Sequence, residues 1–382
     1  MRLHKRKERV PHHGDDRGKA KFFHGRVEEK KSFIGLMKET SHTGKGTSFL
    51  VQGSPGVGKT ALIEELKKIA IVEKWRVCDI SIECLWDNDV FYEWLSKNNS
   101  DGSWNAWLGL DFFIFKAGVK RNAEINDKSM LKVIQKIKSK PTLIVLDEAQ
   151  ILGNRNKVPV EYHWKIEMTL EELHNLQTKK GFVFLIGGLG MTKNIFKDLG
   201  ISRFSNNYVF NLDPLDKVSE RAIIKDWLVE CSKKMNDAII EHWIDEIVKE
   251  THGWAQHITS YTTAIFDELK ESKGELKPEG LERVLTRGLE LKERYYDQTL
   301  ENFNKRESQV VATLLQQNKN LKSFSEENII EFINKKLSLE ESEKLYKRLV
   351  QDGIFHRNKK KEYIVPVPSM RTWLINEYGL DK

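Results

Sequence analysis

Cysteine is scarce in this chain of 382 residues, and neither a disulfide framework nor a zinc knuckle fits its three scattered cysteines, Cys78, Cys84 and Cys231. This scarcity is typical of a reduced, intracellular protein. Long apolar runs are also missing: no stretch approaches the roughly 18 apolar residues of a membrane-spanning helix. The basic N-terminus is not followed by the apolar segment of a secretory signal. We therefore expect a cytoplasmic protein with no membrane partner.

A strong excess of one charge is absent as well. The chain has 63 lysines and arginines against 56 aspartates and glutamates, which gives a net charge of +7. This small excess permits a nucleic-acid partner without requiring one, and a well-solvated basic surface explains it equally well. The hydrophobic share of 39% is too high for wholesale disorder. The sequence has no internal repeat and no low-complexity segment.

From residue 47 onward, β-prone runs alternate with amphipathic helical patterns. Strands are predicted at 47–52, 76–82, 142–146, 182–186 and 208–212. Because helices separate the strands, the pattern predicts a parallel α/β sheet of right-handed βαβ units. After Pro214 the pattern becomes helical. We expect a flexible basic tail (1–21), an α/β core (22–213), a helical lid (214–275) and a C-terminal domain (276–382).

The core contains an aromatic-rich insertion at 85–120, which includes Trp86, Trp94, Trp104 and Trp107. Aromatic side chains at this density form either the core of a small helical subdomain or a surface for stacking bases or docking a partner. The sequence does not decide between these interpretations.

A phosphate-binding motif follows the first predicted strand. The pattern G-x-x-x-x-G-K-S/T is matched by Gly53-Ser54-Pro55-Gly56-Val57-Gly58-Lys59-Thr60. Its glycines let backbone N–H groups turn inward as an anion nest, and the following helix points its positive end at the phosphates. Lys59 can reach the β- and γ-phosphates, and the Thr60 hydroxyl can ligate Mg²⁺. The position between a strand and an amphipathic helix supports a nucleotide-binding loop.

Two acidic residues follow the buried strand at 142–146. Asp147 and Glu148 lie at the carboxyl end of this strand, where open α/β sheets bind ligands. We predict that Asp147 holds Mg²⁺ and that Glu148 is the general base for the attacking water. The alternative is a solvated strand end. This acid pair favours ATP hydrolysis, and since no guanine-specific N-K-x-D motif occurs, the predicted nucleotide is ATP.

These two motifs, with D-E-A-Q at 147–150, resemble the AAA+ superfamily of P-loop ATPases. The similarity is greatest to its initiator-like branch, the ORC/Cdc6-like and transposon-regulator-like ATPases, with features of the STAND signalling ATPases. It covers about 22–270 and, more loosely, a winged helix at 300–379. The resemblance implies a parallel-sheet core, a helical lid and a C-terminal winged-helix domain.

Two further segments carry this resemblance. Gly25 and Arg26, in Gly-Arg-Val-Glu-Glu, resemble the G-R-x-x-E box beside the adenine; the alternative is a simple helix start. Arg203, in Ile-Ser-Arg-Phe, resembles the arginine finger that reaches a neighbour's γ-phosphate; the alternative is a surface ion pair. A finger acting in trans implies an ATP-dependent homo-oligomer, either a ring or a filament.

The sequence also departs from the family pattern. The fourth strand ends in Gly187 and Gly188, without the polar residue that usually serves as sensor 1, and Thr192 or Asn194 are substitutes. The lid lacks the usual sensor-2 arginine, and His257 either replaces it or is a buried structural histidine. Both departures favour a slow or partner-stimulated ATPase.

The C-terminal domain is predicted to contain three helices and a basic β-hairpin, as in a winged helix. DNA contacts are assigned to the hairpin residues Arg357, Lys359, Lys360 and Lys361. The mixed charges of the third helix, 339–352, disfavour insertion into a major groove, and winged helices also bind proteins.

Together these features predict a regulator that binds and hydrolyses ATP with Mg²⁺, associates with duplex DNA and recruits a partner protein. A nuclease, a transposase or another effector would fit, in replication, transposition or defence against mobile DNA. The alternative is a STAND-like scaffold that binds nucleotide, turns over little and uses its winged helix to bind protein.

Overall fold

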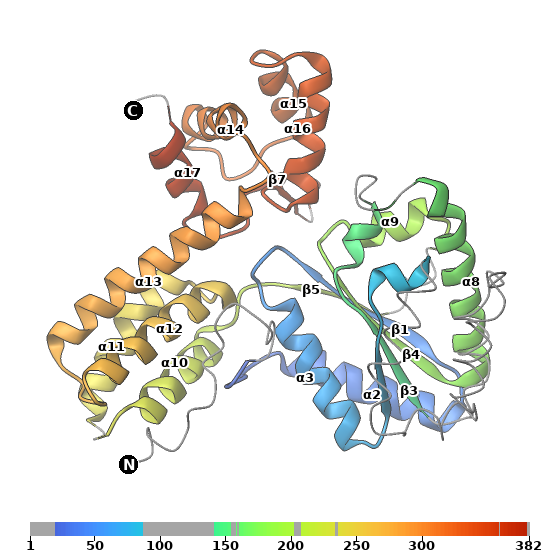
Figure 1. Cartoon of the computed structure of the whole chain (residues 1–382), viewed down its shortest axis with the longest axis horizontal. Helices are drawn as coiled ribbons and strands as arrows, with labels where there is room; N and C mark the ends of the chain where they lie inside the picture. Colours follow the sequence, from blue (N-terminus) through green and yellow to red (C-terminus); the bar gives the residue numbers. More distant parts are fainter. Residues whose placement is uncertain are drawn as a thin grey trace, which may run out of the picture. The chain divides into compact units, whose positions relative to one another are not determined.

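A computed structural model describes residues 20–86, 141–153, 158, 160–201, 208–233, 236–358 and 360–379. Its main sheet has five strands in the order β2-β3-β4-β1-β5 (Figure 1). The strands are β1 (Thr47–Gly53), β2 (Arg76–Asp79), β3 (Thr142–Leu146), β4 (Phe182–Gly188) and β5 (Tyr208–Leu212). The pairs β2–β3, β3–β4 and β4–β1 are parallel, as predicted. Since β1 and β3 both border β4, their carboxyl ends lie at the same sheet edge.

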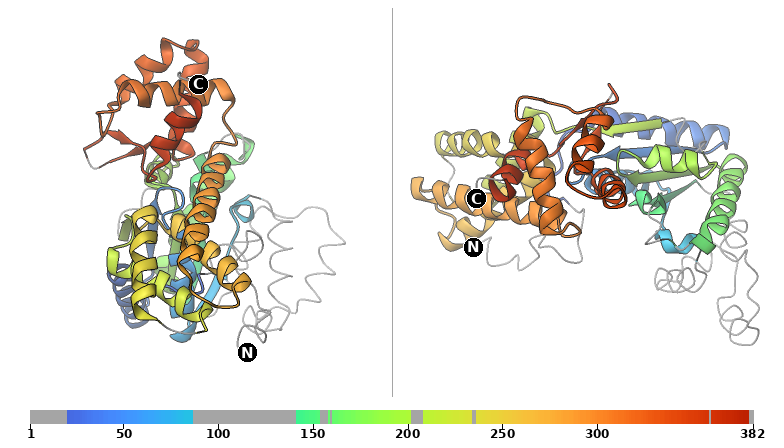
Figure 2. Two further views of the ribbon diagram at one scale, coloured as in Figure 1. Left: turned by 90° about the vertical axis from the view of Figure 1, so that its left-hand side faces the viewer. Right: turned by 90° about the horizontal axis from the view of Figure 1, so that it is seen from above.

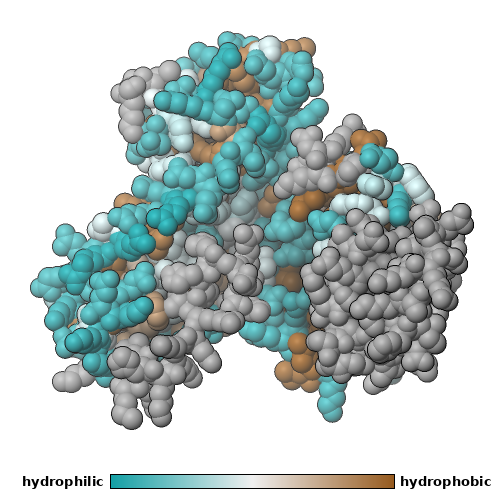
Figure 3. All heavy atoms as spheres, in the orientation of Figure 1, coloured by the Kyte–Doolittle hydropathy of each residue, from teal (hydrophilic) through white to brown (hydrophobic). Residues whose placement is uncertain are grey.

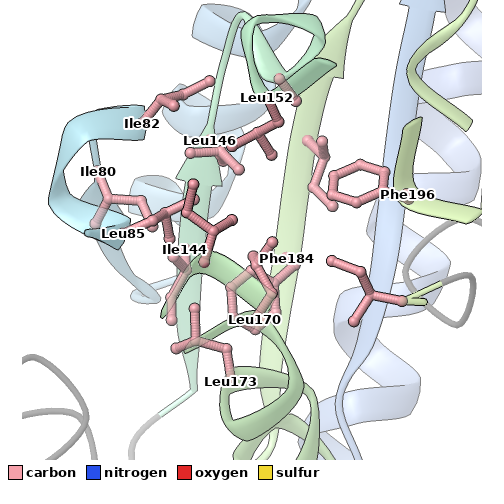
Figure 4. Packing of buried hydrophobic residues seen from close by; sticks show 14 of the residues in the cluster. Ile80, Ile82, Leu85, Ile144, Leu146, Leu152, Leu170, Leu173, Phe184 and Phe196 are labelled. Carbon is pink, nitrogen blue, oxygen red and sulfur yellow. The ribbon is translucent and has the colours of Figure 1, made fainter. Parts of the chain in front are cut away.

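The two central strands are apolar because both of their faces are covered. All residues of β3 and β4 are buried. The helices around the sheet are α2 (Val27–Thr43), α3 (Lys59–Val72), α8 (His163–Lys180) and α9 (Thr192–Asp198). Figure 4 shows Ile144 and Phe184 of the sheet packed with Leu170 and Leu173 of α8. This packing fixes the carboxyl edge of the sheet.

Short 3-10 helices occur at η1 (Ile82–Leu85), η2 (Ala149–Gly153) and η3 (Val160–Tyr162). One of them marks a departure from the sequence-based expectations: the strand predicted at 76–82 ends at Asp79, and η1 follows it. Helix α8 is preceded directly by η3. Most of the predicted insertion at 85–120 lies outside the described residues.

Four helices form the lid region: α10 (Lys217–Cys231), α11 (Asp237–Thr251), α12 (Ala255–Glu271) and α13 (Pro278–Thr299) (Figure 2). Their shared core includes Trp243, Tyr261 and Ile265. Gly288 of α13 lets the helix approach Tyr261, because a Cβ there would lie 2.4 Å from the tyrosine ring. The face of this region visible in Figure 3 is largely hydrophilic. The predicted boundary at 276 separates α13 from the lid helices against which it packs.

The C-terminal helices are α14 (Lys305–Gln317), α15 (Glu326–Asn334), α16 (Leu339–Gln351) and α17 (Met370–Tyr378). Between α16 and α17, β6 (His356–Arg357) pairs antiparallel with β7 (Tyr363–Ile364). The predicted order of three helices and a hairpin is therefore present. Ser325 and Ser338 cap α15 and α16, each accepting a hydrogen bond from a backbone N–H three residues later.

Packing divides the chain into two compact units. The first contains Val27–Gln52 and Ile63–Asn211; the second contains Gly53–Leu62, the chain from Leu212 onward and the described residues before Val27. The phosphate-binding motif thus packs with the helical lid. No helix in the described ranges is long and apolar enough to span a membrane.

Candidate nucleotide-binding site

The predicted phosphate loop has the backbone conformation that an anion nest requires. Gly56 and Gly58 have φ values of +73° and +100°, a region that side chains other than glycine disfavour. Lys59 then begins α3, so its helix N-terminus directly follows the loop. The buried Lys59 ammonium donates to the Ser54 carbonyl at 3.0 Å, which places it against the loop. The loop therefore presents a cation and a helix N-terminus to an anion.

Arg26 contacts this loop directly. Its guanidinium donates to the Val57 carbonyl at 3.2 Å and to the Asp213 carbonyl at 2.7 Å. Gly25, with φ +80°, brings the backbone close to α10, where a Cβ would lie 2.6 Å from the Ser219 hydroxyl. The Gly-Arg box thus links the phosphate loop to the start of the lid. Its predicted place beside the adenine stays a prediction.

The first turn of α12 covers the phosphate loop. The Gln256 N–H donates to the Gly56 carbonyl at 2.9 Å. A Cβ on Gly56 would lie 2.7 Å from the Tyr295 hydroxyl and 3.0 Å from Trp254 Nε1. Glycine at position 56 is therefore required both by its φ angle and by the close approach of these lid side chains.

A buried carboxylate positions this turn. Glu220 of α10 accepts 2.5 Å hydrogen bonds from the Thr251 hydroxyl and from the Gly253 N–H. The backbone is left-handed at both His252 (φ 51°) and Gly253 (φ 72°), so the chain reverses sharply before α12. The Thr251 hydroxyl also donates to the Ile247 carbonyl at 3.1 Å, so Glu220 is needed chiefly as the acceptor for the buried Gly253 N–H. We regard it as a positioning residue that the sequence did not reveal.

His257 is a buried structural residue, as one of the two sequence interpretations held. Its Nε2 lies 3.1 Å from the Tyr296 hydroxyl, and the residue is 0% exposed. Burial, followed by the nearby Lys292 ammonium, lowers the pKa of His257 to about 3. The imidazole is therefore neutral near pH 7, which does not suit a cationic phosphate sensor.

The two predicted catalytic acids directly follow β3. The Asp147 Oδ1 accepts a 2.8 Å hydrogen bond from the Glu148 N–H, and Glu148 has an unusual φ of 57°. A Cβ on Gly187 of β4 would lie 2.2 Å from the Asp147 Oδ1. Glycine at 187 thus makes room for the Asp147 carboxylate at the carboxyl edge of the sheet.

The sequence did not assign a role to Gln150. Its Nε2 donates to a carboxylate oxygen of Glu148, and its Oε1 accepts from the Leu189 N–H at 3.1 Å. The proposed sensor-1 substitutes are placed differently: Thr192 is buried and donates to the Leu189 carbonyl at 2.7 Å, whereas Asn194 is exposed on α9. The glutamine in D-E-A-Q was the available signal, but its contact with β4 depends on tertiary structure.

The basic hairpin is exposed. Arg357, Lys360 and Lys361 are exposed around the β6–β7 turn, and Asn358 organises this turn by accepting from the Lys360 and Glu362 N–H groups at 2.9 and 3.0 Å. Lys359 and the predicted arginine finger Arg203 lie outside the described residues. The hairpin presents three described cations on one short turn.

In α16, glutamates pair with lysines one helical turn later. Lys344 contacts Glu340 at 2.6 Å, and Lys347 contacts Glu343 at 3.7 Å. These pairs balance the charge along the exposed face of the helix. They are consistent with the expectation that this helix is poorly suited to a major groove.

No protein-family model matches the sequence. No curated protein matches it either. A solved Walker-type ATPase of Pyrococcus abyssi is 15% identical, with a TM-score of 0.59 over 92% of this chain and 95% of that one. The ORC2 protein of Aeropyrum pernix, solved in ADPNP-ADP complexes, is 12% identical, with a TM-score of 0.56 over 95% of both chains. At such low identity the similarity establishes the fold. The chain has a fold similar to that of this Walker-type ATPase and of this ORC2 protein, with a parallel-sheet core followed by a helical region.

Proposed function

We propose that the protein binds and hydrolyses ATP. The observation that carries this proposal is the phosphate loop, in which two left-handed glycines precede Lys59 and the N-terminus of α3. Backbone N–H groups of the loop would bind the phosphates, with Lys59 at the β- and γ-phosphates. Arg26 would keep the loop in shape through its hydrogen bond to Val57.

The two acids after β3 would complete the chemistry. Glu148 would accept a proton from the attacking water, and Asp147 would hold the metal ion together with Thr60. The topology supports this proposal, because β1 leads into the phosphate loop and ends at the same sheet edge as β3. No cluster of three or more His, Cys, Asp or Glu side chains for a metal occurs within the described ranges.

The residues present suit Mg²⁺. This ion keeps several water ligands and usually binds through one or two carboxylates and substrate phosphates. A hydroxyl at Thr60 and a carboxylate at Asp147 are oxygen donors of the required kind. When bound, Mg²⁺ would neutralise the negative charge that develops on the phosphate oxygens.

ATP binding would serve a regulatory task. The exposed cations Arg357, Lys360 and Lys361 support binding to the phosphates of duplex DNA, with Lys359 as a further contact. We infer an ATP-dependent ring or filament in which Arg203 acts on a neighbour's nucleotide, and which recruits a partner enzyme. The C-terminal domain would be a winged helix, and the cell compartment the cytoplasm.

A STAND-like scaffold is the second candidate. Its support is the absence of a sensor side chain at Gly187 and Gly188, together with the neutral, buried His257 in the lid. Such a protein would bind ATP, turn over slowly and use its C-terminal domain to bind another protein.

The steady-state ATPase rate, measured with and without duplex DNA, separates these functions. Glu148→Gln is the blank, because it keeps the size of the side chain and removes the base. A DNA-stimulated rate that is lost in the blank supports the DNA-coupled ATPase. A rate equal to the blank, with ATP still bound, supports the scaffold. Lys59→Ala, if it binds ATP with full affinity, refutes the phosphate loop itself.

A further inference from the structure

Gln150 joins the proposed general base to the neighbouring strand. Its amide donates to the Glu148 carboxylate and accepts from the Leu189 N–H, which follows the end of β4. A primary amide can donate from one end and accept at the other, so these two partners fix its orientation. Glu148 is exposed, and Gln150 therefore restrains a side chain that solvent would leave free.

Strand β4 ends in two glycines, so its carboxyl end has no polar side chain that could contact Glu148. Gly187 and Gly188 place no polar side chain there, and the space beside Gly187 is filled by the Asp147 carboxylate. The backbone N–H of Leu189 and the side chain of Gln150 together supply a polar connection at this edge. Both groups belong to the compact unit that contains β3 and β4.

We propose that Gln150 is a positioning residue that holds the Glu148 carboxylate in the orientation required to accept a proton from the attacking water. This inference rests on the role proposed for Glu148. A base in a fixed orientation reacts faster because it is already aligned with the proton that it removes. Gln150 would thus affect the chemical step and leave nucleotide binding unchanged.

Kinetics of two variants test this proposal. We expect Gln150→Ala to lower kcat about tenfold while the Kd for ATP stays within about twofold. Gln150→Glu keeps the size of the side chain but cannot donate to Glu148 when ionised, so it should lower kcat at least as much. A normal or raised kcat in either variant, or a change confined to Kd, overturns the proposal.

A matched control separates positioning from stability. Gln177 of α8 is a buried glutamine remote from Glu148 in sequence, bonded to Ser48 at 3.2 Å, and Gln177→Ala should reduce stability without changing kcat of the folded enzyme. If Glu148→Gln hydrolyses ATP at the normal rate, the proposed base itself is wrong. If Glu148→Gln is inactive and Gln150→Ala is normal, only the role of Gln150 is wrong.

A second observation concerns two adjacent tyrosines of α13. The Tyr295 hydroxyl lies over Gly56 of the phosphate loop, beside Trp254 Nε1, and neither polar atom has a hydrogen bond of normal geometry. Burial raises the pKa of Tyr295 to about 12, although Thr299 and Trp254 act in the opposite direction. The hydroxyl is thus a neutral group in contact with the loop.

The next residue contacts the C-terminal helices. The Tyr296 hydroxyl donates to the Pro368 carbonyl at 2.7 Å, and its ring centroid lies 5.2 Å from that of Trp373 in α17. Helix α13 therefore contacts the phosphate loop through Tyr295 and the C-terminal helices through Tyr296.

We infer that Tyr295 and Tyr296 couple occupancy of the phosphate loop to the packing of the C-terminal domain. Two neighbouring residues of one helix cannot shift independently, so a displacement at Gly56 reaches Pro368 through α13. This inference also rests on ATP binding to the loop. It gives the proposed regulator a physical connection between nucleotide and the C-terminal helices.

Hydrogen exchange of β7 and α17, measured with and without ATP, tests the coupling. We expect ATP to change the exchange rates in the wild type by about threefold or more, and Tyr296→Phe to bind ATP normally with this response reduced. Tyr346→Phe is the matched control, since it removes a 2.8 Å hydrogen bond to Tyr363 within the C-terminal domain and should keep the response.

The outcomes are distinguishable. No ATP-dependent change in the wild type, despite bound ATP, overturns the coupling, and so does a full response in Tyr296→Phe. If Tyr296→Phe does not fold, Tyr295→Phe is measured in its place. We expect this variant to fold and to show a reduced ATP-dependent change in hydrogen exchange. Failure of the wild type to bind ATP refutes the proposed function as well.

Discussion

Acidification should destabilise the lid through His257. This imidazole is fully buried, and its pKa is about 3 in the folded protein, against about 6.5 for an unfolded histidine. Between these two pKa values, the imidazole is therefore protonated in the unfolded state and neutral in the folded state. The stability associated with the neutral imidazole is complete above pH ~6.5 and is lost as pH falls toward about 3.

The magnitude follows from these two values. Each pKa unit corresponds to about 1.4 kcal/mol, so moving from about pH 7 to about pH 5 should cost about 2 kcal/mol of unfolding free energy. The charged groups nearest the ring do not offset this cost. Lys292 and His252 both lower the pKa of His257, and Lys292 is itself paired with Glu250 at 3.1 Å.

Urea unfolding of the wild type and of His257→Gln at both pH values measures this effect. The variant keeps a polar side chain that does not titrate, and all other titrating groups are common to both proteins. The wild type should lose about 2 kcal/mol more than the variant on acidification. Equal losses would refute the conclusion that His257 is buried in its neutral form and would reopen a role at the phosphates.

Three other perturbations have defined outcomes. Arg26→Ala removes two hydrogen bonds from a charged donor and should weaken ATP binding about tenfold. Calorimetry measures this affinity. An unchanged affinity would show that the phosphate loop keeps its conformation without Arg26. Replacing Lys360 and Lys361 with glutamate should weaken duplex binding and reduce the slope of the logarithm of the binding constant against log salt by about 2. An unchanged slope would show that the hairpin does not contact the DNA. Glu220→Ala should cost about 1 to 3 kcal/mol in urea unfolding, because the buried Gly253 N–H loses its acceptor whereas the Thr251 hydroxyl still donates to the Ile247 carbonyl. Glu220→Gln should cost less, because its amide oxygen can replace the one carboxylate oxygen that accepts both bonds. Equal costs for the two variants would argue against these bonds.

Local sequence patterns predicted the parts of the fold that depend on burial. The runs at 142–146 and 182–186 are apolar because both faces of a central strand are covered, and the structure has strands at both places. The phosphate loop is equally local, since its glycines are needed for the backbone angles of the loop itself. The second strand was predicted too long because apolar residues continue through η1, where they join the core without sheet pairing.

Contacts between distant residues could not be predicted in this way. Gln150 acts on Leu189, 39 residues later, and Tyr295 approaches Gly56 from a helix near the C-terminal domain. Neither of these contacts can be inferred from the residue's own segment. His257 illustrates the same limit, because only its tertiary surroundings distinguish a buried, neutral imidazole from a phosphate sensor.

The packing of α13 has a practical consequence for dissecting the protein into fragments. A fragment ending at 213 would contain every glycine of the phosphate loop but would lack Trp254 and Tyr295, which cover Gly56. A fragment starting at 276 would carry α13 without α12, leaving the apolar side of the helix, including Val284, in water. A fragment boundary between Thr299, the last residue of α13, and Asn304, the N-cap of α14, keeps both helices intact.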